Sequence, residues 1–278
     1  MKIVIVFTCF NRKDKTSRCI SNLISGNREH DISFVVVDDG STDGTKEMLS
    51  ELGKEYKISV INTANKFYSA GMRMGMEYLL NQTTPYDYLL MINDDVDFKY
   101  GCISMLIEQS VLQNAAVIVG TIVNSKGEWV NSDGLKNYGA VRYTNSIKYR
   151  TLGSDDWEIE ADCFNANCVL IPYEAFKKTG SIDRVYNHSL GDFDYGFMLK
   201  RNGYRIHSSK DIIGSCDRNP RKGTWIDSNN SIRKRIQLKE SVKGQPFKPW
   251  FHYLKKNFGL RYALYYSITP YIRILLKK

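Results

Sequence analysis

The chain has 278 residues, of which 42% are hydrophobic and 25% are charged, which suits one domain of roughly 200 to 250 residues with an appendage and excludes a disordered or fibrous protein. No apolar run approaches the roughly 18 residues of a membrane-spanning helix, and the apolar stretch near the start is too short for a signal peptide. The six cysteines are scattered without CxxC spacing, so we expect reduced thiols and a cytoplasmic protein.

The net charge of +9 is unevenly distributed along the chain. Residues 228–278 hold twelve Lys and Arg side chains against Glu240 alone, a net charge of +11, whereas residues 1–227 hold 27 basic and 29 acidic side chains, a net charge of −2. The basic character therefore belongs to the C-terminal segment and does not indicate a body that binds nucleic acid.

Apolar runs alternate with helix-like segments through the first 113 residues. Strands are expected at 3–8, 33–37, 58–62 and 88–92, and helices at 14–24, 44–52, 70–80 and 100–113. The second and fourth apolar runs have no polar alternation, as in parallel strands that helices cover on both faces. We therefore predict an α/β fold with a Rossmann-like, mostly parallel sheet flanked by helices.

The strands of this half all end in polar residues. Parallel sheets bind ligands beyond the C-terminal ends of their strands, and these ends read TCFN, DDG, NTAN and NDD in chain order. No GxGxxG follows the first strand and no GxxxxGK[ST] occurs, which excludes a dinucleotide-binding Rossmann enzyme and a P-loop NTPase. Phosphate groups on a ligand would need a metal ion instead.

The second half is organised differently. Residues 118–157 are richer in Gly, Asn and Tyr, which predicts hairpins or loops around a second substrate. A strand-like CVLI closed by Pro172, a helix at 173–178 and a helix from near Asp192 to Asn202 follow. We expect residues 1–117 and 118–227 to form the two halves of one domain, the first with the polar strand ends and the second around a second substrate, with 228–278 as a tail.

Two acidic pairs stand at strand ends. Asp94 and Asp95 can present the hard oxygen ligands that Mg²⁺ or Mn²⁺ prefers, with coordination sites left for diphosphate oxygens. A solvated acidic turn is the alternative for such a pair, but its place after a buried strand favours the metal. Asp38 and Asp39 face opposite ways if the strand continues, so we expect one to reach a ligand and the other to hold the turn.

A third acidic pair opens the last predicted helix of the domain. Asp192 and Asp194 lie about 200° apart around a helix, so they cannot face the same pocket. One of them can serve as a base, and a helix cap is the alternative for Asp192.

Together these segments resemble the inverting glycosyltransferases of family 2, which have the GT-A fold. TCFNR is similar to the family's T-x-N-R nucleotide loop, VVVDDGSTDGT to its most recognisable segment, and NKFYSAGMRMGMEYLL to a helix start in the family. INDDVD stands where the DxD-type metal motif falls, and GDFDYGFMLKRNGYRI resembles the acidic motif and its helix. The resemblance covers residues 1–209, and CFNANCVLIPYEAFKKTGSID resembles a subgroup that glycosylates surface polysaccharides.

The resemblance implies roles for the residues that match the motifs of the family. Thr8, Phe10 and Asn11 would line the base pocket, Asp39 would hydrogen-bond a uracil or thymine ring, and Asp94 would bind the ribose. The nucleotide-sugar donor would therefore carry UDP or dTDP.

Three further roles concern the reaction centre. The resemblance implies that Arg73 reaches the diphosphate, that Asp95 ligates Mn²⁺ or Mg²⁺, and that Asp192 is the catalytic base. Single displacement at a sugar carbon passes through an oxocarbenium-like transition state and needs one base and one stabiliser of the leaving group. Asp192 and the Asp95-bound metal would fill these two needs.

The chain departs from the family pattern at several positions. Asn93 opens the metal motif in place of Asp, with Asp97 an alternative ligand to Asp95, and Gly191 stands in place of Glu before Asp192. Ala166 replaces the usual Gly of the acceptor segment. For the usual late histidine, the chain offers an early His207 or, instead, Asp217.

The tail interleaves Lys and Arg with aromatic side chains over residues 246–278. Charges interrupt it too often for a membrane span, whereas aromatics beside cations are typical of an amphipathic helix at a lipid surface. A C-terminal helix packed on the domain is the alternative, and no segment resembles a base-reading nucleic-acid module. We expect the tail to lie on the inner face of the cell membrane and the acceptor to be a polyprenyl-linked saccharide.

The sequence therefore predicts a metal-dependent inverting glycosyltransferase, of the hexosyltransferase type, in bacterial capsule, O-antigen or related cell-surface polysaccharide synthesis. Two alternatives stay open. A nucleotidylyltransferase should have a Gly-rich basic loop after the first strand, which TCFNRKDK lacks. A non-catalytic, membrane-docked nucleotide-sugar binder should retain its activity without the carboxylate of Asp192.

Overall fold

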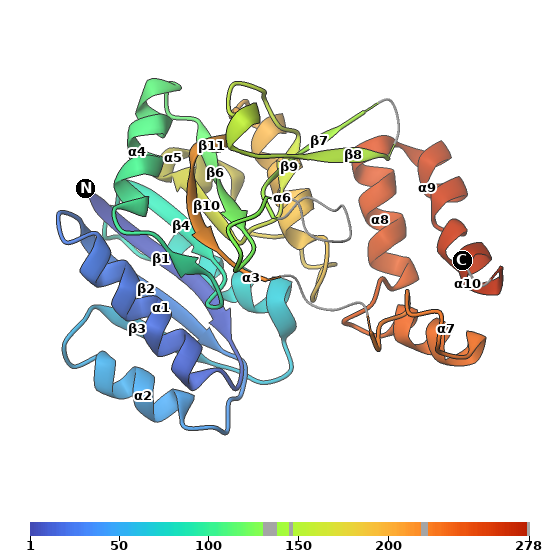
Figure 1. Ribbon diagram of the computed structural model, residues 1–278, viewed down its shortest axis with the longest axis horizontal. Coiled ribbons are helices and arrows are strands. Elements are labelled where there is room, and N and C mark those ends of the chain that lie inside the picture. The colour runs from blue at the N-terminus through green and yellow to red at the C-terminus, as the bar shows by residue number, and fades with distance from the viewer. Residues whose placement is uncertain (130–137, 145–146, 218–221, 277–278) are drawn as a thin grey trace.

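The computed structural model describes residues 1–129, 138–144, 147–217 and 222–276. Within these residues an eight-stranded sheet runs in the order β3-β2-β1-β4-β10-β6-β11-β5 and curls through the molecule (Figure 1). Its strands are β1 Lys2–Cys9, β2 Asp31–Asp38, β3 Ile58–Asn62, β4 Tyr88–Ile92, β5 Asp97–Phe98, β6 Val117–Val123, β10 Cys168–Pro172 and β11 Ile206–Ser215.

Helices cover both faces of this sheet. They are α1 Lys13–Gly26, α2 Thr45–Leu52, α3 Phe67–Leu80, α4 Cys102–Leu112, α5 Tyr173–Thr179 and α6 Gly191–Arg201. The strands and helices expected over the first 113 residues are all present. The predicted α/β fold is confirmed.

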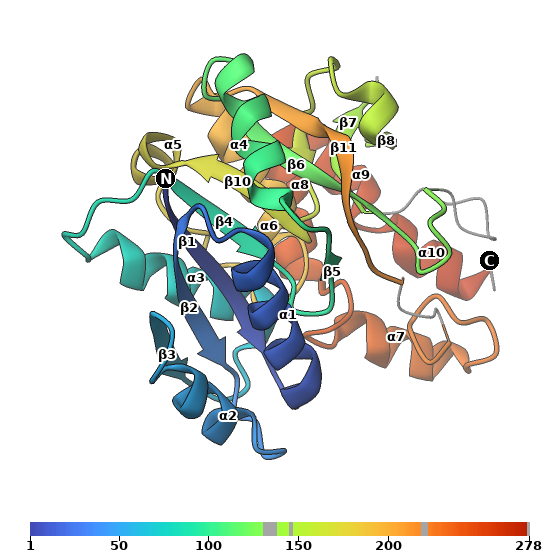
Figure 2. The same cartoon turned by 60° about the vertical axis from the view of Figure 1, so that its left-hand side comes forward.

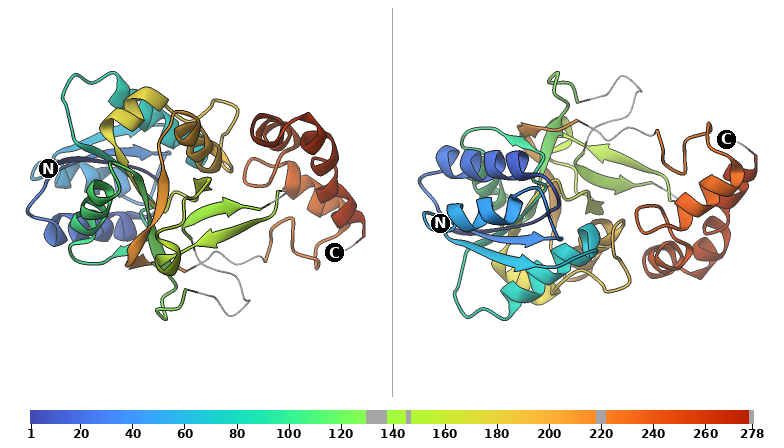
Figure 3. Two further views of the ribbon diagram at one scale, coloured as in Figure 1. Left: turned by 90° about the horizontal axis from the view of Figure 1, so that it is seen from above. Right: turned by 90° about the horizontal axis from the view of Figure 1, so that it is seen from below.

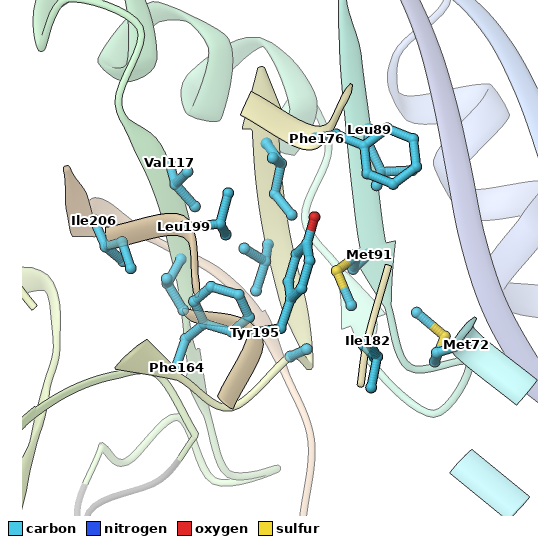
Figure 4. Packing of buried hydrophobic residues seen from close by; sticks show 14 of the residues in the cluster. Met72, Leu89, Met91, Val117, Phe164, Phe176, Ile182, Tyr195, Leu199 and Ile206 are labelled. Atoms are coloured by element: carbon cyan, nitrogen blue, oxygen red, sulfur yellow. The ribbon is translucent and has the colours of Figure 1, made fainter. Parts of the chain in front are cut away.

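Strand alternation explains why there are two apolar cores. Ile5 and Phe7 of β1 pack in one cluster with side chains of α1, α2 and α4, whereas Val6 packs in the other with α3, α5 and α6. Neighbouring residues of a strand point to opposite faces, so an unbroken apolar strand supplies both cores. Figure 4 shows the second cluster, where Tyr195 and Leu199 of α6 meet the sheet.

The strand directions are mostly parallel. β1 pairs in parallel with β2 and β4, β2 with β3, and β6 with β11. β10 runs antiparallel between β4 and β6, so the C-terminal ends of β4 and β6 lie beside the start of β10. This brings the segment before Cys168 to the rim on which β1, β2 and β4 end.

The expected hairpins of residues 118–157 are present in part. β7 Ala140–Tyr143 pairs antiparallel with β8 Tyr149–Leu152 and with β9 Cys163–Phe164. The same stretch also begins inside β6, a fully buried strand. Residues 130–137 and 145–146 of that expectation lie outside the described residues.

Four helices follow the sheet: α7 Ile232–Glu240, α8 Phe247–Phe258, α9 Leu260–Tyr266 and α10 Thr269–Leu275. They form a layer at one end of the molecule, away from α1 and α2 (Figures 1 and 3). Tyr253 and Leu254 of α8 are buried against the second core, and Tyr253 hydrogen-bonds Tyr143 at 2.8 Å. The predicted helical tail is therefore present, and α8 packs on the domain. In the described part of the chain, no helix has the length and apolarity needed to cross a bilayer.

Candidate functional site

The two carboxylates at the end of β2 have different hydrogen-bond partners. Asp38 accepts the Ser41 N–H at 3.0 Å and holds the turn, as expected of one of the pair. Asp39 accepts the N–H groups of Lys66 at 2.7 Å and Phe67 at 2.9 Å. Asp39 therefore joins the end of β2 to the start of α3, where free N–H groups favour a negative charge.

The end of β1 lies at the same rim. Asn11 adopts a left-handed backbone with φ of 50°, its Oδ1 accepts the Thr42 N–H at 2.7 Å, and its N–H donates to Ser41 Oγ at 2.9 Å. The Phe10 side chain is 52% exposed beside this contact. The loop after β1 is thus tied to the loop that carries Asp39, and an exposed aromatic ring stands next to it.

Thr8 lies beneath α3. A Cβ added at Gly71 would stand 2.6 Å from Thr8 Cγ2, and one at Gly75 would stand 2.6 Å from Val6 Cγ2. Only glycine allows this approach of α3 to β1, because real Cβ contacts are never that short. The two glycines therefore allow α3 to pack closely on β1, next to the rim on which Thr8 and Asp39 lie.

The end of β4 brings Asp94 and Asp95 under one cation. Arg12 Nη1 donates to Asp94 Oδ1 at 2.9 Å and to Asp95 Oδ2 at 3.0 Å, and Thr16 Oγ1 donates to Asp94 Oδ2 at 2.7 Å. Burial raises the pKa of Asp94, while Thr16 and Arg12 act in the opposite direction. Arg12 closes the TCFNR segment, but no role is predicted for it from the sequence.

Asp95 fits a metal ion that is shared with a ligand. Its side chain is 18% exposed, compared with 2% for Asp94, so it is the accessible member of the pair. Among the described residues no group of three or more His, Cys, Asp or Glu side chains could hold a metal by itself. Mg²⁺ and Mn²⁺ commonly combine one or two carboxylates with waters and substrate phosphates, which is the donor set that this rim offers.

Asp192 lies in the first turn of α6 and is 7% exposed. Its Oδ2 accepts the Ala166 N–H at 3.1 Å and its Oδ1 accepts the Phe193 N–H at 3.0 Å. Burial raises the pKa of Asp192 to about 6, against the lowering effect of these hydrogen bonds. A carboxylate with this pKa is ionised near neutral pH and can still accept a proton.

Asp194 faces away from Asp192, as the helical spacing predicted. It is fully buried, and it pairs with Lys256 of α8 at 2.6 Å and accepts from Asn257 at 2.9 Å. Its role is to anchor α8 on the domain, since an unpaired buried carboxylate would be costly.

Tyr68 contacts Ala166, the residue whose N–H bonds the Asp192 carboxylate. Its hydroxyl donates to the Ala166 carbonyl at 3.3 Å, and the charges of Asp192 and then Asp95 add to burial in raising its pKa. Next in the chain, Asn167 Oδ1 accepts from Asn93 Nδ2 at 2.7 Å. Residues 166–167 therefore contact both Asp192 and the segment that carries Asp94 and Asp95.

Arg73 lies in α3 but bonds in another direction. Its Nη1 donates to the carbonyls of Tyr186 at 3.1 Å and Asp183 at 3.4 Å. These bonds hold the loop before α6 and do not join Arg73 to the rim carboxylates. A contact between Arg73 and a diphosphate therefore stays a prediction.

Packing accounts for one departure from the family pattern. A Cβ added at Gly191 would lie 2.6 Å from Ser69 Oγ and 2.9 Å from Ile182 Cγ2. A glutamate cannot fit there without moving α3. The other candidates serve local structure, since His207 Nδ1 contacts the Trp157 carbonyl at 3.2 Å and Asp217 accepts the Ser125 N–H at 2.9 Å.

The order and directions of the strands, with helices on both faces, define a fold of the GT-A type. The family model described as "Glycosyl transferase family 2" matches residues 4–180, more than half of the chain. The chain belongs to glycosyl transferase family 2, and the resemblance of its motifs is confirmed.

A curated relative is "Succinoglycan biosynthesis protein ExoA" of Rhizobium meliloti (strain 1021). It is 23% identical over 211 residues, which cover 73% of this chain and 59% of that protein. The chain thus matches less than two thirds of the relative's length, and the relative's name links that protein to succinoglycan biosynthesis.

Solved structures share the fold. S. aureus TarS 1-349 in complex with UDP-GlcNAc has a TM-score of 0.60 at 12% identity, over 99% of this chain and 90% of that chain. The mannosyltransferase PcManGT from Pyrobaculum calidifontis, in complex with GDP-Man and Mn²⁺, has a TM-score of 0.56 at 13% identity, over 99% and 73% of the two chains. At these identities the likeness shows the fold alone.

Proposed function

We propose that this glycosyltransferase moves a sugar from a UDP- or dTDP-sugar to an acceptor hydroxyl with inversion, and that Asp192 is its base. The observation that carries the proposal is the buried Asp192 carboxylate, with a pKa of about 6, which accepts the Ala166 N–H beside Asn167, a residue bonded to Asn93 at the end of β4. A base near the metal carboxylate is the arrangement that single displacement requires.

In this proposal the rim of the sheet binds the nucleotide. Thr8, Phe10 and Asn11 line the base pocket, Asp39 binds the uracil or thymine ring, and Asp94 binds the ribose. These residues are the polar or exposed side chains at the ends of β1, β2 and β4. The first half of the domain, residues 1–117, would therefore hold the donor, and residues 118–227 the acceptor.

The reaction centre needs a proton acceptor and a stabilised leaving group. Asp192 takes the proton from the acceptor hydroxyl as that oxygen bonds to the anomeric carbon and the bond to the nucleoside diphosphate breaks. Asp95 would hold Mn²⁺ or Mg²⁺, which supplies Lewis-acid stabilisation of the diphosphate charge when bound. Arg73 can add to this only if it leaves the loop carbonyls that it binds here. The Mn²⁺ of the mannosyltransferase complex supports a divalent ion in this fold.

We further propose a polyprenyl-linked acceptor at the inner face of the cell membrane. Support comes from a stripe of apolar side chains along α9 and α10 that are 48–59% exposed: Leu260, Leu264, Ile268, Ile272 and Leu275. Within α9 the spacing places Leu260 and Leu264 on one side of the helix, and within α10 it does the same for Ile272 and Leu275. Exposed basic residues lie beside the stripe, as at an anionic lipid surface. Synthesis of a cell-surface polysaccharide agrees with the name of the curated relative.

Calorimetry of nucleotide binding tests the donor site. UDP and dTDP are titrated with and without Mn²⁺ into the wild type and into Asp95→Ala, with Asp31→Ala, an exposed aspartate at the start of β2, as the matched control. We expect one nucleotide to bind only with Mn²⁺, and this binding to be lost in Asp95→Ala but kept in the control. Binding of neither nucleotide, or equal binding without metal, would contradict the proposal.

A further inference from the structure

A cavity of about 480 Å³ lies between the start of α3 and the segment around α7. This volume falls within the roughly 300–1,000 Å³ that ligand pockets occupy. Its lining residues are Phe67, Gly223, Thr224, Trp225, Leu238, Ser241, Val242, Lys243 and Gly244. Except for Phe67, all of them lie beyond residue 180, where the match to the family model ends. The cavity is therefore a feature of this chain's C-terminal segment.

The cavity adjoins the reaction centre on two sides. Phe67 lines it and donates its N–H to Asp39, while the next residue, Tyr68, reaches Ala166 beside Asp192. On the other side, the Gly244 carbonyl accepts from Ser189 Oγ at 3.4 Å, three residues before Asp192. A ligand in this cavity is thus held by the same two segments that position the donor site and the base.

The cavity lining is largely apolar and includes one positively charged side chain. Phe67, Trp225, Leu238 and Val242 supply apolar surface, and the Ser241 hydroxyl is already used on the Leu238 carbonyl at 2.6 Å. Lys243 is the only charged residue of the described lining, and it is exposed.

The charge of Lys243 also acts on His188, which lies shortly before Asp192 in the chain. Burial lowers the pKa of His188, and the charge of Lys243 adds to that effect. The carboxylates beside the lining are already bonded: Glu240 contacts Lys239 Nζ at 2.6 Å, and Asp227 accepts the Gly223 N–H at 2.8 Å. An apolar pocket whose one charged lining residue is a lysine suits an amphiphile with an anionic head.

We propose that this cavity binds the acceptor's isoprenyl diphosphate end, with the chain against Trp225, Leu238 and Val242 and a phosphate at Lys243. This inference rests on the proposed function and names its acceptor subsite. Helix α7 contributes Leu238 to the cavity lining, and α10, which carries part of the apolar stripe, lies beside α7 (Figure 2), where the Tyr271 hydroxyl donates to Glu240 at 2.6 Å.

Calorimetry with farnesyl diphosphate, a water-soluble isoprenyl diphosphate, tests this proposal. The titration is done with saturating UDP and Mn²⁺ present, so that the donor site is filled, and it is repeated with inorganic diphosphate and with farnesol. We expect farnesyl diphosphate to bind about tenfold or more tightly than either fragment, since chain and head are recognised together. Equal binding of inorganic diphosphate, or complete displacement by UDP, would overturn the proposal.

Variants locate the site. Val242→Asp and Lys243→Gln should each weaken farnesyl diphosphate about tenfold while leaving UDP binding unchanged. Lys234→Gln is the matched control, because Lys234 is an exposed lysine of α7 that does not line the cavity. Unchanged affinity in both cavity variants would contradict the assignment. Failure of the wild type to bind either UDP or dTDP would instead refute the proposed function, so the two failures are distinguishable.

Discussion

Asp192 shows how a functional carboxylate can cost stability. Its pKa rises from 3.8 to about 6 on folding, so between these pH values the unfolded chain ionises while the folded protein stays protonated. The unfolded state then binds fewer protons, and stability falls as pH rises through this window. Above about pH 6 the full cost of the buried charge is present.

We therefore predict that Asp192→Asn stabilises the protein at pH 8 by roughly 2 kcal/mol relative to its effect near pH 4, because the amide never ionises. Urea unfolding of the wild type and the variant at the two pH values measures this difference. Asp217→Asn, at a loop carboxylate whose pKa is lowered, should show the opposite sign. A pH-independent effect of Asp192→Asn would contradict a raised pKa.

Arg12 is the second residue whose charge matters at the site. Its guanidinium lies 2.9 Å from Asp94 and 3.0 Å from Asp95, so it offsets the charge that would attract a divalent ion. Arg12→Gln should raise the affinity for Mn²⁺ in the absence of nucleotide by roughly tenfold. Electron paramagnetic resonance of free Mn²⁺ measures this, with the exposed Arg18→Gln as control. Weaker Mn²⁺ binding in Arg12→Gln would show that the arginine organises the metal carboxylates instead.

At the scale of elements, close contacts between helices and neighbouring segments position the site. Gly191 at the start of α6 meets Ser69 of α3, and Gly71 of α3 meets Thr8 of β1. The start of α6, helix α3 and the end of β1 are therefore connected by contacts that an added methyl group would disturb.

We predict that Gly191→Ala destabilises the protein by about 1–3 kcal/mol through overpacking against Ser69. Ser69→Gly should remove part of this cost when combined with Gly191→Ala, since the two positions share one contact. Thermal unfolding of the single and double variants gives the coupling. Simple additivity of the two effects would show that the contact is not the cause.

Elements with a clear period were predictable from sequence. The unbroken apolar β2 and β4, with helices between them, could only be buried parallel strands. β11 was not predicted, because Ser208, Ser209, Lys210 and Asp211 interrupt its apolar pattern. The antiparallel direction of β10 was also beyond sequence, since strand direction depends on which neighbours it meets and not on its own composition.

The candidate site was predictable where motifs end strands and was missed where contacts are long-range. Asp39, Asp94, Asp95 and Asp192 lie in the expected elements. Tyr68 was missed because its place in the site depends on a hydrogen bond to Ala166, which is 98 positions away in the chain. Such contacts leave no periodic signal in a single sequence.

At the scale of the whole molecule, the uneven charge along the chain corresponds to a difference in charge between two ends of the structure. The sheet and its rim form one end and the α7 to α10 layer the other (Figure 3). α8 is anchored through Asp194 and Lys256 at 2.6 Å, so the packed alternative for the tail holds for α8. The exposed stripe on α9 and α10 is the part that is left to meet a partner.

We predict that Ile268→Asp with Ile272→Asp lowers binding to vesicles containing phosphatidylglycerol about tenfold or more, because charged groups replace apolar contacts. Leu112→Asp is the matched control, since Leu112 of α4 is 82% exposed on another part of the molecule. Vesicle sedimentation at two salt concentrations separates the apolar contribution to vesicle binding from the electrostatic contribution. Equal losses in the control, or none in the stripe variant, would contradict membrane contact through α9 and α10.

The central claim is that Asp192 is the base of an inverting transfer. Proton NMR of the sugar released by slow hydrolysis of α-linked UDP- and dTDP-sugars, with Mn²⁺, tests it directly. The account predicts that the β-anomer appears first, that the rate rises with pH through about 6, and that Asp192→Asn is slower by roughly a hundredfold or more with nucleotide binding intact. Initial release of the α-anomer, or an unchanged rate in Asp192→Asn, would contradict it.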